Sequence, residues 1–388
     1  MSRFISYRQK MRYISVICVL MVIVLALVLT YLISHYKNEA IKRSENLFKL
    51  DEEQYAAMKE KLEEDEADSV PQSQSEKYNF YEKLALHLQV NVLFLGDEIM
   101  SGAGVSDDSD NWVNLIVGAI ENECGSDVKG GDYSRPETNP FYGYHIMNSY
   151  SRGLKYDLMV VCYGGNEPPE VFSIYYDGLL RSIKRQNPKC EIYCIIAADR
   201  NGYGENAENM RSLCEFYGGI CIDMNKYFED KRINYGSVLS GDNIPNVTGC
   251  TKYFDAIYSV IKSGLKNERS VPTKIKANTE TSKLFDTYQF TAAKDMNRVS
   301  DKVYEFTTTG TIAGLVYYKT YFGGNIRVYV NGKRVLTESN KFDTNITRQV
   351  RCLMISNNLS GVSKIRIETD SADNMTNIFG VAVCGIAD

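Results

Sequence analysis

Acidic and hydroxyl side chains follow an apolar run in the first half of the chain. The run Val90–Leu95 leads into Gly96, and Asp97, Glu98 and Ser101 come directly after it. A carboxylate can act as a general base, and a hydroxyl beside a base can act as a nucleophile. If the run is a strand of a parallel sheet, these side chains lie at its carboxyl end, where ligands bind in such folds.

Two later segments place polar side chains in equivalent positions. Asn166 and Glu167 follow the apolar run Asp157–Tyr163, and Asp242 precedes the last predicted helix. The amide of Asn166 can donate a hydrogen bond to an anionic oxygen. If Glu98, Glu167 and Asp242 converge, they form an acidic cluster that can bind a cation or carry out hydrolysis with two carboxylates of separated pKa.

These segments resemble, in order, the sequence blocks of the SGNH (GDSL) hydrolases. Gly96-Asp97-Glu98 is similar to the block in which a strand ends in Gly-Asp-Ser, and Gly164-Gly165-Asn166-Glu167 to the block that ends in Gly-x-Asn-Asp. Gly241–Gly249 resembles the last block, Asp-x-x-His-Pro-Asn-x-x-Gly, and Gly131 or Gly143 matches the glycine of the second block. The resemblance implies a flavodoxin-like α/β fold of three layers and an ester-hydrolysing ancestry, with Asn166 as a donor to the oxyanion.

The catalytic positions of that family hold other residues here. Glu98 stands at the position of the nucleophilic serine, and Ile244 stands at the position of the histidine. Gly241 replaces the aspartate three residues before it, with Asp242 one residue out of register. Without serine and histidine there is neither an alkoxide to form nor a base near neutral pH. Ser101, as a substitute, would still lack the histidine, so the sequence predicts a member without the family's chemistry.

Purely structural roles explain several of these residues equally well. Asp97 can hold its turn together by accepting backbone N–H groups, and Asn166 can also be a turn residue. Glu98 at the start of a helix is favoured by the helix dipole. His145 lies among aromatic residues and reads as a packed helix residue.

Apolar runs alternate with helix-period stretches through residues 79–265. The predicted strands are Val90–Leu95, Asp157–Tyr163, Glu191–Ala197 and Gly219–Met224, and the predicted helices are Asn111–Glu123, Phe172–Gln186, Asn206–Tyr217 and Cys250–Ser263. This alternation predicts a parallel sheet covered by helices on both faces. Residues 266–284 are polar and contain Pro272, which predicts a linker.

Residues 285–388 carry strand signals only. Ile326, Val328 and Val330 alternate with other residues, and Asn331-Gly332 follows, which is a strong signal for a hairpin turn. Together with the closing apolar run Ile378–Cys384, this pattern predicts a β-sandwich.

The N-terminal region predicts a membrane anchor. Residues 13–34 contain no charged side chain and are long enough to cross a bilayer as one helix. Residues 1–12 carry basic but no acidic side chains, which favours the cytoplasmic side. Residues 35–78 read as a charged helical stalk and linker. We therefore expect a single-pass protein of the cell membrane with its C-terminal bulk outside the cytoplasm.

Composition narrows the classes of partner. The net charge of −5 argues against nucleic acid as a partner. The ten cysteines lie mostly in apolar runs, which predicts free thiols, and no spacing indicates a metal site or cofactor. The sequence gives no sign of the oligomeric state.

Together these features predict a membrane-anchored SGNH-like protein that binds a cell-envelope polymer, a carbohydrate, without catalysis. The first alternative is an active carbohydrate-ester hydrolase or O-acetyltransferase with an unconventional site. The second is a structural envelope protein.

Overall fold

The computed structural model describes residues 77–149, 154–164, 167–202, 204–321, 323–341 and 349–386. The predicted cytoplasmic tip (1–12), membrane span (13–34) and all but the last two residues of the predicted stalk (35–78) lie outside these residues. Within the described part, no helix is both long and apolar enough to cross a membrane.

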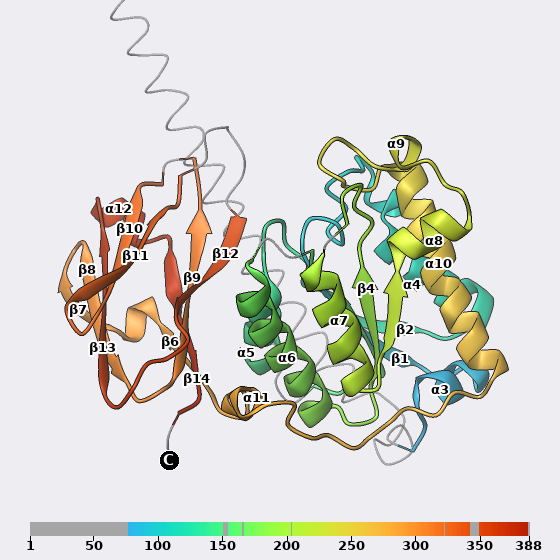
Figure 1. Ribbon diagram of the computed structural model, residues 1–388, viewed down its shortest axis with the longest axis horizontal. Helices are drawn as coiled ribbons and strands as arrows, with labels where there is room; N and C mark the ends of the chain where they lie inside the picture. Colours follow the sequence, from blue (N-terminus) through green and yellow to red (C-terminus); the bar gives the residue numbers. More distant parts are fainter. Residues whose placement is uncertain are drawn as a thin grey trace, which may run out of the picture. The chain divides into compact units, whose positions relative to one another are not determined.

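The first part of the described chain is built on a five-stranded parallel sheet (Figure 1). Its strands are β1 (Val90–Gly96), β2 (Val128–Asp132), β3 (Leu158–Cys162), β4 (Glu191–Ile196) and β5 (Ile220–Asp223), in the order β2-β1-β3-β4-β5. This is the flavodoxin-like order, and it confirms the predicted parallel sheet. Strand β2 escaped prediction because its sequence, Val-Lys-Gly-Gly-Asp, contains one large apolar residue.

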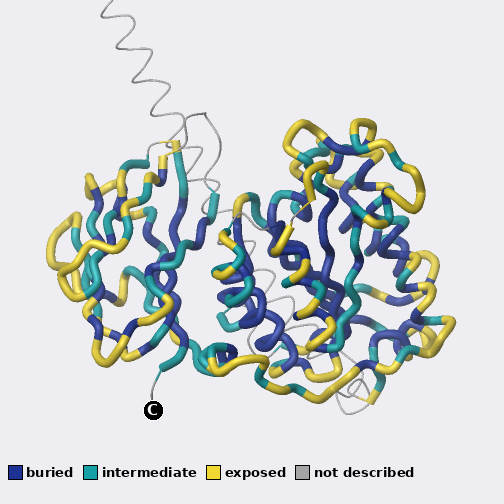
Figure 2. Tube along the Cα trace, viewed as in Figure 1, coloured by how far each residue is buried: buried dark blue, intermediate teal, exposed yellow. Residues whose placement is uncertain are grey.

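Helices lie on both faces of this sheet (Figure 1). They are α3 (Phe80–Ala85), α4 (Trp112–Cys124) and α10 (Val247–Lys266) on one face, and α5 (Pro140–Ser149), α6 (Pro169–Gln186) and α7 (Glu205–Phe216) on the other, with the short α8 (Met224–Asp230) and α9 (Tyr235–Val238) before α10. Strands β1, β3 and β4 are almost wholly buried between the helices, whereas the edge strands β2 and β5 are mostly half-buried (Figure 2). Asparagine side chains cap four of these helices, α3, α4, α9 and α10: for example, Asn111 accepts the Val113 N–H at the start of α4, and Asn246 accepts the Gly249 N–H at the start of α10.

The C-terminal part contains two antiparallel sheets that share one hydrophobic core. One sheet has the order β11-β10-β13-β8-β7 and the other β12-β9-β14-β6. The strands are β6 (Tyr288–Ala292), β7 (Asn297–Ser300), β8 (Val303–Thr308), β9 (Ile312–Lys319), β10 (Asn325–Val330), β11 (Lys333–Ser339), β12 (Gln349–Ser356), β13 (Ser363–Thr369) and β14 (Ile378–Cys384), with a short helix α12 (Ala372–Met375). Asn331 and Gly332 both have positive φ, 50° and 82°, so the predicted hairpin turn joins β10 to β11.

The segment predicted as a linker packs against the α/β part. Arg269 pairs with Glu191, which is fully buried (Nε to Oε2, 2.5 Å). The Lys184 ammonium donates to the Pro272 carbonyl at 3.0 Å. A short helix, α11 (Glu280–Leu284), follows, and the Phe285 ring lies directly over Gly178 of α6. Most residues of the predicted linker are exposed, but this strap is fixed to the α/β part at Arg269 and Pro272 and leads to Phe285 on α6.

The nine cysteines in the described residues are free thiols, and eight of them are buried. Cys162 lies in β3, Cys194 in β4 and Cys384 in β14, as expected for cysteines in apolar runs. They behave as small apolar core residues.

Candidate functional site

Asp97 fastens together the ends of two neighbouring strands. Its side chain is buried and accepts the N–H of Ile99 at 3.1 Å and the N–H of Gly164, beyond β3, at 2.5 Å. Burial raises the pKa of Asp97 well above its usual value, and the nearby Glu98 carboxylate raises it further, while the two backbone donors oppose this shift. Both carboxylate oxygens are thus occupied in holding the turn.

Glu98 lies half-buried at the same edge, and a backbone donor points at its carboxylate. Its Oε2 accepts the N–H of Glu137 at 2.8 Å. Glu137 belongs to the loop between β2 and α5 and has a φ of 54°, a left-handed conformation that is uncommon for a residue with a side chain. Thr138 fixes this loop to the end of β1 by donating its hydroxyl to the Gly96 carbonyl at 3.1 Å.

A third carboxylate belongs to this group. Burial raises the pKa of Glu167, a hydrogen bond from the Asn139 side chain lowers it, and the charge of Glu98 raises it. Glu98 and Glu167 also both raise the pKa of Asp97. The structure therefore brings these three carboxylates close enough to influence one another. In the described part of the chain, no set of three or more His, Cys, Asp or Glu side chains is arranged to hold a metal ion.

The Ser101 hydroxyl lies one turn further along the chain. It donates to the Glu98 carbonyl at 3.3 Å and is half-buried. This local bond is typical of a serine in a helical turn. In the structure, Ser101 is therefore a turn residue behind Glu98.

The loop that contains Ile244 lies beside the turn that follows β1. A Cβ atom added to Gly104 would lie 3.0 Å from Ile244 Cγ2 and 2.1 Å from the Pro245 carbonyl oxygen, so this glycine permits a close approach. Asp242 is exposed on this loop, and neighbouring Asn243 donates its amide to Asp199 at 2.9 Å. Of the three acidic residues in the predicted cluster, Glu98 and Glu167 both raise the pKa of the buried Asp97, whereas Asp242 is exposed.

The structure gives the remaining predicted residues different positions. Gly131 pairs with Leu93 inside β2, so it does not lie in the loop at the sheet edge. Gly143 lies in α5 against Tyr163, and Asn166 lies outside the described residues. Glu137 cannot be predicted from the sequence, because a backbone N–H in a left-handed conformation leaves no sign in the side-chain pattern.

The two histidines in the described part of the chain form hydrogen bonds away from Glu98. His145 is buried in α5, where its Nδ1 lies 2.6 Å from the Tyr288 hydroxyl, and burial lowers its pKa to about 3. His87 precedes β1, at the opposite end of the strand from Glu98, and its Nδ1 lies 2.6 Å from the Cys124 carbonyl oxygen. His145 is thus the packed helix residue that the sequence predicts.

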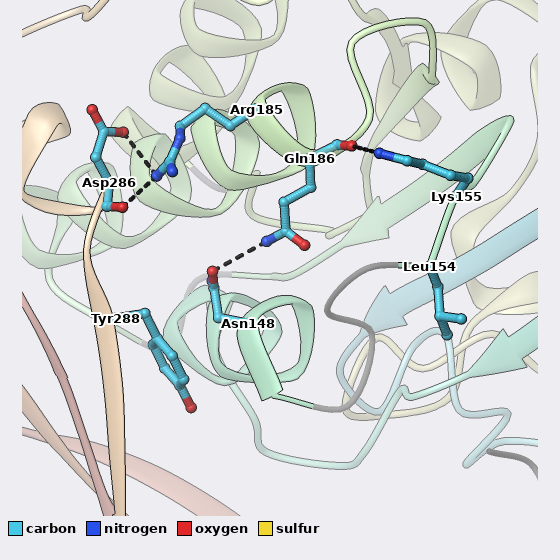
Figure 3. A pocket seen from close by; sticks show the side chains of 7 residues that line it. All are labelled: Asn148, Leu154, Lys155, Arg185, Gln186, Asp286 and Tyr288. Carbon is cyan, nitrogen blue, oxygen red and sulfur yellow. Dashed lines mark hydrogen bonds and ion pairs between the residues drawn. The ribbon is translucent and has the colours of Figure 1, made fainter. Parts of the chain in front are cut away.

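A hollow of about 330 Å³ has none of the three carboxylates in its lining (Figure 3). It is lined by Asn148, Leu154, Lys155, Arg185, Gln186, Asp286 and Tyr288. Its polar groups are largely paired with each other: Arg185 contacts Asp286 at 3.2 Å, and Gln186 donates to Asn148 at 3.1 Å. The hollow is therefore a separate feature, and the carboxyl edge stays the candidate site.

Comparison with solved structures identifies the fold. A two-domain esterase active on acetylated mannans, co-crystallised with mannopentaose, is similar with a TM-score of 0.65 and 14% identity, over 78% of this chain and 93% of that chain. The same kind of esterase without the oligosaccharide gives 0.65 and 14%, over 79% and 94%. An acetylxylan esterase from Geobacillus stearothermophilus gives 0.39 and 14%, over 46% and 96%.

No protein-family model matches the sequence, and no curated protein matches it. The similarity therefore concerns three-dimensional structure. Over most of its length, this chain shares the fold of the two-domain esterase active on acetylated mannans.

Proposed function

We propose that this protein is a membrane-anchored, extracytoplasmic SGNH-like protein that binds a cell-envelope carbohydrate polymer and does not hydrolyse it. One observation carries the proposal: the Glu98 carboxylate, at the position of the family's nucleophile, accepts the Glu137 N–H at 2.8 Å. The location rests on the apolar segment 13–34 and the basic residues before it.

The chemistry of ester hydrolysis explains why this contact favours an inactive site. The reaction needs a nucleophile, a base and donors aimed at the oxygen that becomes negative. Here the side chain at position 98 is a carboxylate. It accepts the Glu137 N–H, so this backbone donor is not available to the oxygen of a bound ester. A negative charge developing beside Glu98 and Glu167 would be repelled by them.

The carbohydrate part of the proposal rests on the similarity to the esterase active on acetylated mannans. That similarity extends over most of both chains, including the antiparallel sheets of this one. Binding of a polymer at the carboxyl edge of the sheet does not require a nucleophilic serine, so the edge can bind carbohydrate without hydrolysing it.

The test is an activity and binding assay on the purified full-length protein. We expect no hydrolysis of aryl acetates above background and no labelling by serine-directed phosphonates. We expect Glu98→Ser alone to stay inactive, because no base is present, and Glu98→Ser with Ile244→His to give at most a weak signal. In affinity electrophoresis, acetylated mannan in the gel should retard the unmodified protein.

Ser101→Ala is the matched control, since it removes the nearest other hydroxyl. Robust esterase turnover by the unmodified protein that is lost in Ser101→Ala or Glu98→Ala would contradict the proposal. That result would favour the second candidate, a carbohydrate-ester hydrolase or O-acetyltransferase. The fold similarity to an esterase active on acetylated mannans supports this candidate. Absence of both turnover and retardation would favour a structural envelope protein.

A further inference from the structure

A buried arginine from the C-terminal sheets reaches the loop that carries Glu137. Arg351 lies on β12 and is 5% exposed. Its guanidinium donates to the Pro136 carbonyl at 2.8 Å and pairs with the Glu137 carboxylate at 2.5 Å. It also donates to the Gln349 side chain at 2.8 Å. The fork of N–H donors therefore grips both the backbone and the side chain of this loop.

A second bond from the same strand holds the end of the loop. The Asn139 amide donates to the Cys352 carbonyl at 2.9 Å, and Asn139 is 4% exposed. The Asn139 side chain also hydrogen-bonds to Glu167. Consecutive residues of β12 thus contact Pro136, Glu137 and Asn139, a short stretch that also contacts Glu98 and Glu167.

The opposite side of the stretch is fixed to the parallel sheet. The Arg135 N–H and the Thr138 hydroxyl both donate to the Gly96 carbonyl, at 3.0 and 3.1 Å. Residues 135–139 are therefore clamped between β1 and β12. A left-handed residue such as Glu137 persists only where its surroundings hold it, and Arg351 supplies such a hold.

We infer that Arg351 is a positioning residue for the candidate site, so that the antiparallel sheets help to shape the ligand-binding edge of the parallel sheet. Arg351 fixes residues 135–139, which places the Glu137 N–H on the Glu98 carboxylate and the Asn139 amide on Glu167. This inference deepens the proposed function and rests on it for the role of the site in polymer binding. The positioning itself does not depend on the identity of the ligand.

The first experiment is hydrogen exchange of backbone amides in the full-length protein. We expect Arg351→Ala to accelerate the exchange of the backbone amides of Arg135, Glu137, Thr138 and Asn139 at least ten-fold and to leave the strands of the parallel sheet unchanged. Arg351→Lys keeps the charge but loses the fork, so it should give a smaller acceleration. Arg366→Ala is the matched control, because Arg366 lies on β13 and pairs with Glu368 within its own sheet.

The second variant covers the case in which Arg351→Ala does not fold. Glu137→Gln keeps the backbone N–H and the buried arginine but removes the ion pair, and we expect it to accelerate the same amides. Unchanged exchange at residues 135–139 in a folded Arg351→Ala or in Glu137→Gln would overturn the inference.

Affinity electrophoresis in acetylated mannan separates this inference from the proposed function. If the unmodified protein is retarded, Arg351→Ala should lose most of the retardation and Arg366→Ala should keep it. Equal retardation of the two variants would overturn the role of Arg351 in binding. If the unmodified protein is not retarded, the proposed function fails, while the exchange experiment still decides whether Arg351 positions the loop.

Discussion

At the scale of single residues, Asp97 connects the ends of two neighbouring strands. Its two oxygens accept the N–H groups of Ile99 and Gly164, one on each of two adjacent strand ends. The sequence suggested this role for Asp97, because aspartate in a turn commonly binds backbone donors. The neighbouring Glu98 accepts a different backbone donor, the N–H of Glu137.

We predict that Asp97→Ala lowers the free energy of unfolding by roughly 2–4 kcal/mol, because two buried N–H groups lose their acceptor at about 1–3 kcal/mol each. Asp97→Asn keeps one acceptor of the same shape and should cost less. Urea denaturation at neutral pH measures both. Equal stability of Asp97→Ala and the unmodified protein would show that the turn does not depend on this side chain.

The stability of the unmodified protein and of Asp97→Asn should also depend differently on pH. The pKa of Asp97 is raised in the folded state, so its contribution to stability is complete below its ordinary pKa of 3.8 and declines as the pH rises through the folded-state value. Asparagine does not titrate. The unmodified protein should therefore gain stability relative to Asp97→Asn as the pH is lowered from about 7 towards 5.

At the scale of elements, predictability from the sequence depended on how local the signal is. Strands β1, β3, β4 and β5 are continuous apolar runs, and the β10–β11 hairpin carries its own turn residues, so all of them were predicted. Strand β2 contains two glycines, and Gly130 is needed because a Cβ there would lie 1.7 Å from the Val92 carbonyl oxygen. The need for glycine at position 130 comes from the neighbouring strand β1, so the sequence around position 130 does not reveal it.

The hairpin offers a prediction at this scale. Gly332 has a φ of 82° and nothing within 4 Å of an added Cβ, so Gly332→Ala introduces backbone strain and no steric clash. We expect this change to lower the free energy of unfolding by about 1 kcal/mol. Asn331→Gly, which tolerates the same conformation, should change it by less than half of that. Thermal unfolding of the two variants side by side measures the difference, and an equal effect would contradict the assigned turn.

Residues of the candidate site could also be predicted only where the sequence signal is local. Sequence blocks indicated Asp97, Glu98, Glu167 and the Ile244 loop, because the family resemblance rests on short local motifs. Glu137 and Arg351 act through a backbone conformation and through a contact between distant strands, which no local motif records. The exposed position of Asp242 also depends on how its loop folds back on Asp199 and Arg200.

At the scale of the whole molecule, the strap after α10 decides where the α/β part ends. Glu191 is fully buried, and its cationic partner Arg269 comes after the predicted domain boundary at 265. Removing one partner of a buried ion pair costs about 3–5 kcal/mol, because the remaining charge is left uncompensated. Phe285 adds apolar packing over Gly178.

We therefore predict that a chain of residues 77–286 is more stable than a chain of residues 77–266 by at least 3 kcal/mol, the lower end of that range. Circular dichroism during urea denaturation measures both. Arg269→Ala in the longer chain is the control and should reproduce a large part of the loss. Equal stability of the two chains would show that residues 267–286 are the open linker that the sequence suggested.

The same strap has a consequence for the order in which the chain matures. Synthesis proceeds from the N-terminus, so all five strands of the parallel sheet leave the ribosome before Arg269 and Phe285 do. Until then Glu191 lacks its ion-pair partner Arg269, and Gly178 lacks the Phe285 ring that packs over it. Both sites on the nascent α/β part are therefore without these contacts. Completion of the first domain thus waits for residues that border the second.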